Sequence, residues 1–440
     1  MKNYTIAPLL LLLACLLLTA CGPGGMSGDG PVPFDLNLGK AEQPDAPVDD
    51  GNLVIWSDIP LAEEMIREFE KANPGVHVDV QEKSLETQLE EYMQAMIDHT
   101  PVDVFVMDSS FLGKFSTLQG FEDLSGAPYG AERYREGVPE KVWGNHLSVK
   151  DDALFALPVA LSPSVLYYRA DLIEKYGFPS EPEALAVYLE SEENLLALAE
   201  GMKPHGHSIF FWYTYIVDLY ISQYGFLDDY LEHNIPKEDV LHSIELMSEI
   251  MQEQYVVNKD FWTPDGQRAI RNDEIIMLFL GSWGEKYLPE FAPDQSGAWR
   301  VTRMPFDLYG WSSSTALAIP SHSGKKELAW KFIEFTMEQG LDFEEWPLVP
   351  AYEPVRTEEW RREQANPYFG NQKTYALYEN LIEKTDAHEL SPFDDELYPL
   401  LYEILYRGME QKLEAEEIYK NFTNAVNENY SEEMEMLHNR

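Results

Sequence analysis

The stretch LVIWSDIPLAEEMIREFEKANPGVHVDVQ, residues 53–81, decides the fold class of this chain. Its apolar start at 53–56 runs into polar residues and then a proline, which is typical of a short buried strand followed by a turn. Apolar residues then recur at helical spacing over 61–69, and the sequence NPG stops the helix. Alternating valines at 76–80 predict a second strand. The stretch is therefore a β-α-β unit, the building block of an α/β fold.

The end of the first strand is a candidate binding edge, because ligands of open α/β sheets bind beyond the carboxyl ends of the strands. That rule places Trp56 and Asp58 at such an edge. A later apolar run, VDVFVMDSS at 102–110, ends in the same way and delivers Asp108 and Ser109. The Asp108 carboxylate has an alternative role, as a cap for the helix expected to follow.

The composition bounds the class of protein. A chain of 440 residues exceeds what one hydrophobic core usually serves, so at least two lobes are expected. The formal net charge is -45, from 77 acidic and 32 basic residues. A surface of this charge repels phosphate backbones, which argues against a nucleic-acid partner. The two cysteines, Cys15 and Cys21, leave the folded part without a disulfide framework.

The N-terminus resembles that of a secreted bacterial lipoprotein. Lys2 precedes a short apolar run that ends in LTAC at residues 18–21, the pattern of a signal peptide with a lipobox. We expect a signal peptide at 1–20, a lipid on Cys21 and a flexible tether over 21–51, rich in Gly, Pro and Asp. The protein would then be lipid-anchored at the extracytoplasmic face of the cell membrane. An uncleaved anchor is the alternative.

Four segments, in this order along the chain, resemble a known family. FEKANPGVHVDV at 69–80 is similar to the mature start of extracellular solute-binding proteins, and FALPVALSPSVLYYRADLIEKYGFP at 155–179 to their passage between lobes. EIIMLFLGSW at 274–283 resembles their strand that ends in Gly-x-Trp, and the segment at 299–340 resembles their return passage. The chain thus resembles the family 1 solute-binding proteins of carbohydrate ABC importers, the class of maltose-binding protein.

The resemblance implies a two-lobed α/β fold of the type II periplasmic binding proteins, with strands that cross a hinge and a helical C-terminal region. The expected lobes are residues 52–158 with 315–350, and residues 159–314 with 351–440. Pro158 and Pro163 restrict the backbone where the hinge is expected. Hinge closure would bury a ligand between the lobes.

The implied ligand contacts are aromatic and polar side chains. Trp283 is expected to project into the cleft, where its flat indole stacks on the C–H face of a sugar ring; packing in the core is its alternative role. Trp311 stands where the family has a glycine, and with Ser312 it would add a ring and a hydroxyl. The expected ligand-binding set is Trp56, Asp58, Asp108, Ser109, Trp283, Trp311 and Ser312.

These features predict a binding protein rather than an enzyme. We expect a monomer without cofactor that captures a sugar or oligosaccharide and delivers it to the transmembrane subunits of an ABC permease. The run GWSSS at 310–314 lacks the closing glycine of a serine-hydrolase elbow. Tyrosines 167–168 and the HGH run at 205–207 are weak metal signals, and no metal site is predicted.

Two alternatives to the sugar-binding prediction stay open. The same fold could hold a polyamine or another organic cation between carboxylates and aromatic rings. A surface glycosidase is the other alternative, and it needs two carboxyl groups at a suitable separation.

Overall fold

The computed structural model describes residues 51–225, 234–339, 348–385, 388 and 390–431. The expected signal peptide, Cys21 and the tether up to residue 50 lie outside the described residues. Within the described part of the chain, no helix combines the length and the apolar character needed to cross a membrane.

The β-α-β unit at the start has the predicted form. Strand β1 (Asn52–Ser57) pairs in parallel with β2 (His77–Glu82), and helix α1 (Glu63–Ala72) connects them. Helix α2 (Gln88–Asp98) then leads to β3 (Val104–Asp108), which pairs in parallel with the other edge of β1. The carboxyl ends of β1 and β3 therefore meet at one edge of the sheet, as predicted.

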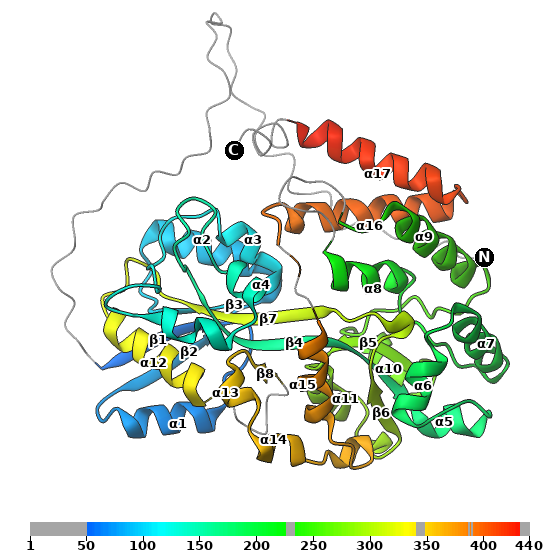
Figure 1. Cartoon of the computed structure of the whole chain (residues 1–440), viewed down its shortest axis with the longest axis horizontal. Helices are drawn as coiled ribbons and strands as arrows, with labels where there is room; N and C mark the ends of the chain where they lie inside the picture. Colours follow the sequence, from blue (N-terminus) through cyan, green and yellow to red (C-terminus); the bar gives the residue numbers. More distant parts are fainter. Residues whose placement is uncertain (1–50, 226–233, 340–347, 386–387, 389, 432–440) are drawn as a thin grey trace, which may run out of the picture. The chain divides into compact units, whose positions relative to one another are not determined.

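The strands of the described residues pair in the order β2-β1-β3-β7-β4-β5, with β6 and β8 also paired to β4. The bounds of the later strands are β4 (Leu157–Arg169), β5 (Met277–Gly281), β6 (Trp299–Thr302), β7 (Trp311–Ala318) and β8 (Val349–Pro350). The long strand β4 first pairs with β7 and β8, and its second half pairs with β5 and β6. Figure 1 shows β4 and β7 running side by side.

The pairing of β4 with β7 is irregular at two places, between Pro158 and Ala160 and between Ser162 and Pro163. Proline has no N–H to donate to the ladder, so each proline interrupts the pairing. The lobe boundaries predicted near residues 158, 314 and 350 fall in β4, in β7 and at the end of β8. Strand β4 pairs directly with β7 and with β8, so the three segments that contain the predicted boundaries lie next to one another. The lobe limits themselves stay a prediction.

Helices make up much of the rest of the described residues, including the predicted helical C-terminal region. Their bounds are α3 (Leu112–Phe115), α4 (Glu140–Gly144), α5 (Ala170–Lys175), α6 (Pro182–Tyr188), α7 (Glu192–Met202), α8 (Tyr215–Tyr224), α9 (Lys237–Gln252), α10 (Pro264–Arg271), α11 (Gly284–Phe291), α12 (Lys326–Gln339), α13 (Glu353–Arg356), α14 (Glu359–Glu363), α15 (Thr374–Lys384), α16 (Asp394–Glu410) and α17 (Ala415–Asn429). Helices α16 and α17 lie side by side in Figure 1, and with α8 and α9 they bury a shared apolar cluster.

The two faces of β4 pack against different parts of the core. Tyr167 belongs to one apolar cluster and Tyr168 to another, and both rings are completely buried. Other elements cover β4 on both faces, so both sets of its alternating side chains are buried.

Candidate functional site

A cavity of about 470 Å³ opens among strands β4 and β7, the residues that follow β3 and β5, helix α8 and the first turns of α16. Two residues of β5 and six residues from other segments complete its lining: Phe279, Leu280, Val142, Asn145, His146, Met304, His388 and Leu390. The volume lies within the range of about 300 to 1,000 Å³ that is usual for small-molecule sites.

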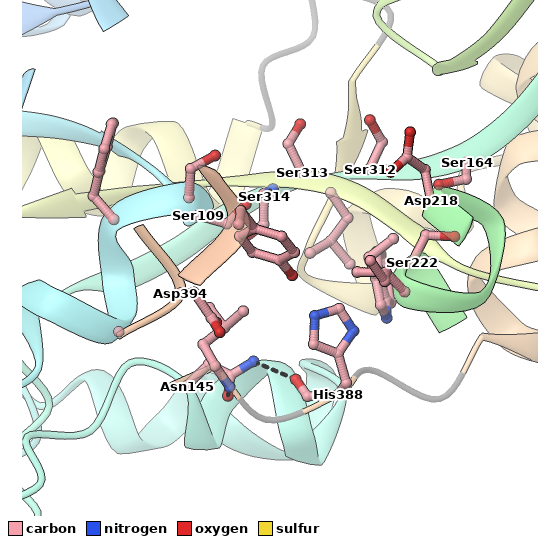
Figure 2. A pocket seen from close by; sticks show the side chains of 18 of the residues that line it. Ser109, Asn145, Ser164, Asp218, Ser222, Ser312, Ser313, Ser314, His388 and Asp394 are labelled. Atoms are coloured by element: carbon pink, nitrogen blue, oxygen red, sulfur yellow. Dashed lines mark hydrogen bonds between the residues drawn. The ribbon is translucent and has the colours of Figure 1, made fainter. Parts of the chain in front are cut away.

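One wall of the cavity is formed by a row of consecutive serines on β7. Figure 2 shows Ser312, Ser313 and Ser314 along this strand, with Asn145 and His388 on the opposite side of the pocket. The Ser314 amide donates to Ser109 Oγ at 2.9 Å, which ties the turn after β3 to the row. These hydroxyls can both donate to and accept from a ligand.

Two tryptophans stand beside this row. The Trp283 indole N–H donates to Ser312 Oγ at 3.1 Å, and the ring lines the cavity. The ring reaches this place because Gly281 lets the chain turn closely from β5 into α11: a methyl group on Gly281 would overlap both the Ser162 hydroxyl and the Trp283 indole. Trp311 also lines the cavity, and its buried indole N–H has no acceptor among the described residues.

Two uncharged histidine rings, His146 and His388, also line the cavity and can accept hydrogen bonds. His146 Nδ1 lies 2.6 Å from the Val142 carbonyl oxygen, so it must carry the proton and donate. That leaves His146 Nε2 as a buried acceptor with no partner among the described residues. Burial lowers the pKa of His146 to about 4 and that of His388 to about 4, which keeps both rings neutral at neutral pH.

Carboxyl groups make the cavity acidic. Asp218 accepts hydrogen bonds from Thr214 Oγ1 at 2.8 Å and from the Tyr402 hydroxyl at 2.9 Å. Burial raises the pKa of Asp218 to about 6, and burial also raises the pKa of Asp395 at the start of α16. Lysine and arginine are missing from the described residues that line the cavity. The lining therefore favours neutral or positively charged ligands over anions.

The structure places four of the seven residues of the expected ligand-binding set in the lining of this cavity: Ser109, Trp283, Trp311 and Ser312. The other three, Trp56, Asp58 and Asp108, are not among the lining residues. The ligand roles of all seven stay predictions.

Trp56 is taken up by packing. Its ring lies 5.9 Å from the rings of Tyr92 and Phe105, and the Lys83 ammonium lies 3.7 Å from its ring centre. Its indole N–H donates to Gln81 Oε1 at 3.0 Å, and only 8% of the residue is exposed. Both faces and the polar atom of this side chain thus have partners within the protein.

Asp58 and Asp108 are held together next to the cavity. The buried Gln88 side chain donates to Asp58 Oδ1 at 2.8 Å and accepts from the Asp108 amide at 3.1 Å. Asp108 Oδ1 accepts from the Ser110 amide at 2.8 Å, which is the capping role considered as its alternative. Burial, reinforced by the Asp108 charge, raises the pKa of Asp58 to about 6, and burial raises that of Asp108.

The sequence interpretation missed the α16 wall. Asp395, Tyr398 and Tyr402 all line the cavity, at positions three and four residues apart that share one face of the helix. This stripe of one acidic residue and two tyrosines was a usable signal. Asn145 and His146 gave none, because they follow a five-residue helix with no motif. Among the described residues, no group of three His, Cys, Asp or Glu is arranged to hold a metal ion.

Solved structures of two-lobed binding proteins share the fold of this chain. A binding protein associated with an ABC transporter of B. animalis subsp. lactis Bl-04, in complex with β-1,6-galactobiose, has a TM-score of 0.71 at 17% identity, over 87% of this chain and 98% of that one. The sugar-binding protein MalE of Xanthomonas citri has a TM-score of 0.69 at 17% identity, over 88% and 100%. At these identities the likeness establishes the fold, the predicted two-lobed α/β class.

Membership is established by the sequence itself. The family model described as bacterial extracellular solute-binding protein matches residues 57–338. This chain therefore belongs to the bacterial extracellular solute-binding proteins, and the resemblance drawn from its motifs is confirmed. The family consists of extracellular binding proteins rather than enzymes.

Proposed function

We propose that this protein captures a sugar or oligosaccharide in the cavity and delivers it to the transmembrane subunits of an ABC importer. The observation that carries the proposal is that the Trp283 and Trp311 rings line the same cavity as the serine row on β7, next to which they lie. A sugar ring presents a C–H face that stacks on indole and hydroxyls that need donors and acceptors around its edge. The cavity supplies both kinds of surface.

The polar groups without partners support the same ligand class. The Trp311 indole N–H requires an acceptor and His146 Nε2 requires a donor, and a sugar hydroxyl can serve as either. Asp218 adds a carboxylate that accepts hydroxyl hydrogen bonds. A sugar with a misplaced hydroxyl would leave one of these groups unpaired at a cost of about 1–3 kcal/mol, which provides specificity.

Delivery rests on the predicted hinge and anchor. We take the lobes as residues 52–158 with 315–350 and 159–314 with 351–440, closing about the adjacent strands β4, β7 and β8. A lipid on Cys21 would hold the monomer at the extracytoplasmic face of the membrane, near its permease. Membership of an extracellular solute-binding family supports this location.

An organic cation such as a polyamine is the second candidate ligand. Asp218 and Asp395 line the cavity, and the described lining contains no lysine or arginine to balance them. Ammonium groups would pair with these carboxylates and lie over the aromatic rings.

A thermal-shift screen of the protein against neutral monosaccharides, oligosaccharides and polyamines separates the candidates. A ligand at a hundredfold its Kd stabilises the folded state by about 2.7 kcal/mol, which raises the melting temperature. We expect saccharides to raise it in the wild type and in Trp360→Ala, whose exposed ring lies outside the cavity lining, but not in Trp311→Ala. Saccharides should be recovered intact afterwards.

Every other outcome of the screen would contradict the proposed sugar-binding function. Stabilisation by polyamines alone would replace it with the cation. Cleavage of the saccharide, abolished in Asp218→Asn, would replace the binding function with a glycosidase. No response to any saccharide would overturn the proposal.

A further inference from the structure

One part of the cavity wall combines a carboxyl group with tyrosine rings. Tyr215 and Asp218 lie three residues apart on α8, and Tyr398 and Tyr402 lie four apart on α16, so each pair shares one face of its helix. All four residues line the cavity, and Figure 2 labels Asp218 there. The Tyr398 and Tyr402 rings stack with 6.4 Å between their centres, and the Tyr402 hydroxyl donates to Asp218 Oδ1 at 2.9 Å. We call these four residues the Asp218 pocket.

The negative charge of Asp218 acts on all three tyrosines of this pocket. Burial raises the pKa of Tyr215, Tyr398 and Tyr402, and the charge of Asp218 raises each of them further. Tyrosine rings around a carboxylate suit an ammonium group, because the ring faces attract a cation and the carboxylate pairs with it.

The carboxylate of Asp218 has no positively charged partner among the described residues. Its oxygens accept from neutral hydroxyls only: Oδ1 from Tyr402, and Oδ2 from Thr214 at 2.8 Å. A carboxylate offers about four lone-pair sites, so each oxygen can accept a further hydrogen bond. Burying a charge without a counter-charge is unfavourable, and an ammonium group bound in the cavity would offset that cost.

The other two carboxyl groups of the lining differ from Asp218. Burial raises the pKa of Asp395, and the positive charge of Lys114 acts against this shift. Asp394 accepts from the Ser391 amide at 2.9 Å in the first turn of α16, where the helix dipole favours a negative charge. Within the described lining, Asp218 is therefore the carboxyl group best placed to gain from a bound cation.

The Asp218 pocket lies close to a ring that we assign to sugar stacking. Ser222 follows Asp218 by one helical turn, about 6 Å along α8, and both residues line the cavity. Gly310, the residue before Trp311, packs against Ser222, because a methyl group on Gly310 would overlap both the side chain and the backbone of Ser222. The Asp218 carboxylate and the Trp311 ring are therefore within reach of one saccharide.

Polar groups without partners distinguish the possible ligand classes. The Trp311 indole N–H requires an acceptor, which a protonated polyamine does not have. Asp218 favours a positive charge, which a neutral sugar lacks. His146 is only 1% exposed, and its Nε2 accepts from either a hydroxyl or an ammonium group. A saccharide that carries an ammonium group meets all three requirements.

We propose that the cavity binds an amino sugar, a saccharide with an unacylated and therefore protonated amine, and that its ammonium group occupies the Asp218 pocket. This proposal rests on the proposed function and narrows its ligand class. The ammonium group donates to the Asp218 oxygens and lies against the tyrosine rings, while the sugar ring stacks on Trp311. A neutral sugar leaves the carboxylate without a counter-charge and binds more weakly.

Isothermal titration of the protein at neutral pH with glucosamine, galactosamine and the β-1,4-linked dimer of glucosamine tests the proposal. Each amine is compared with its N-acetylated form and with the neutral sugar that has a hydroxyl in place of the amine. We expect at least one amine to bind about tenfold more tightly than both of its neutral counterparts, since a hydrogen bond to a charged group contributes an effect of this size.

Two variants that each remove one negative charge from the lining locate the ammonium group. Asp218→Asn should reduce the advantage of the amine over its neutral counterparts from about tenfold to less than about twofold. Asp395→Asn is the matched control and should keep the advantage, because Lys114 already offsets the charge of Asp395. An equal reduction in both variants would mean that the overall charge of the cavity attracts amines, and it would overturn the Asp218 pocket.

The wild-type titration separates this proposal from the function on which it rests. Equal affinity for the amines and their neutral counterparts, or binding of neutral saccharides alone, would overturn the amino sugar and leave sugar binding in place. No binding of any saccharide would overturn both.

Discussion

Trp56 and Trp283 stand near the carboxyl ends of two strands, yet one ring packs in the core and the other lines the cavity. Trp56 is still inside β1, so its side chain points into a layer between the sheet and α2. Trp283 comes two residues after β5 ends, on the turn into α11. The strand-end rule locates a binding edge, but a residue inside the strand obeys the alternation of the sheet.

The largest effect that tests this comparison is on stability. Trp56→Ala removes a nearly buried ring from contact with Tyr92 and Phe105, so we expect a loss of about 3–5 kcal/mol in the free energy of unfolding. Urea denaturation measures the loss, and titration of the folded variant should give an almost unchanged affinity for a single sugar. A variant with normal stability and abolished binding would instead make Trp56 a ligand contact.

The second test concerns Trp283, the tryptophan that follows β5, and its effect on ligand binding. Trp283→Ala removes the ring that lines the cavity, and we expect the binding free energy to weaken by about 2–3 kcal/mol, on the order of a hundredfold in Kd. Since the ring is only partly buried, its loss should destabilise the fold less than Trp56→Ala does. Full affinity in Trp283→Ala, with a large loss of stability, would show that the two tryptophans have exchanged roles.

The smallest effect concerns the acidic wall of the cavity. Because the folded-state pKa of Asp218 is raised to about 6, the folded protein favours the protonated form, and this stabilising contribution is lost as pH rises from about 4 to about 6. An asparagine at this position cannot titrate, so the Asp218→Asn variant does not lose this part of its folding stability as the pH rises. We expect its stability relative to wild type to improve by roughly 2 kcal/mol between about pH 4 and about pH 7.5.

Urea denaturation at the two pH values measures this change. Glu86→Gln, which alters an exposed carboxyl group, serves as the control and should show no comparable trend. A difference between Asp218→Asn and wild type that stays constant with pH would mean that Asp218 is not held in its protonated form by burial.

Local patterns identified much of the fold. The valine alternation at 76–80 and the helical spacing at 61–69 correspond to β2 and α1, and the expected helical C-terminal region contains α15, α16 and α17. Pairing of neighbouring strands in a β-α-β unit follows from short connections, so it can be predicted from sequence. The Gly-Ser-Trp motif likewise marked a residue that lines the cavity.

The opposite wall could not be predicted in the same way. Asn145 donates to the His388 carbonyl across 243 residues of chain, and no periodicity relates the two segments. Tyr402 on α16 donates a hydrogen bond to Asp218 on α8, and these two residues are 184 positions apart in the sequence. The expected helical C-terminal region includes α16, but the face of this helix that turns toward the cavity was not predicted.

By itself, the sequence determined the class of the chain, the family and the positions of its principal strands and helices, because these depend on short-range periodicity and on motifs of adjacent residues. The tertiary structure alone decided that Trp56 packs in the core, that Asp218 and His146 line the same cavity as the β7 serines, and that Trp262 stacks on Trp283. The direction of a side chain depends on which distant element covers each face of its strand or helix. That covering is a property of the packed chain.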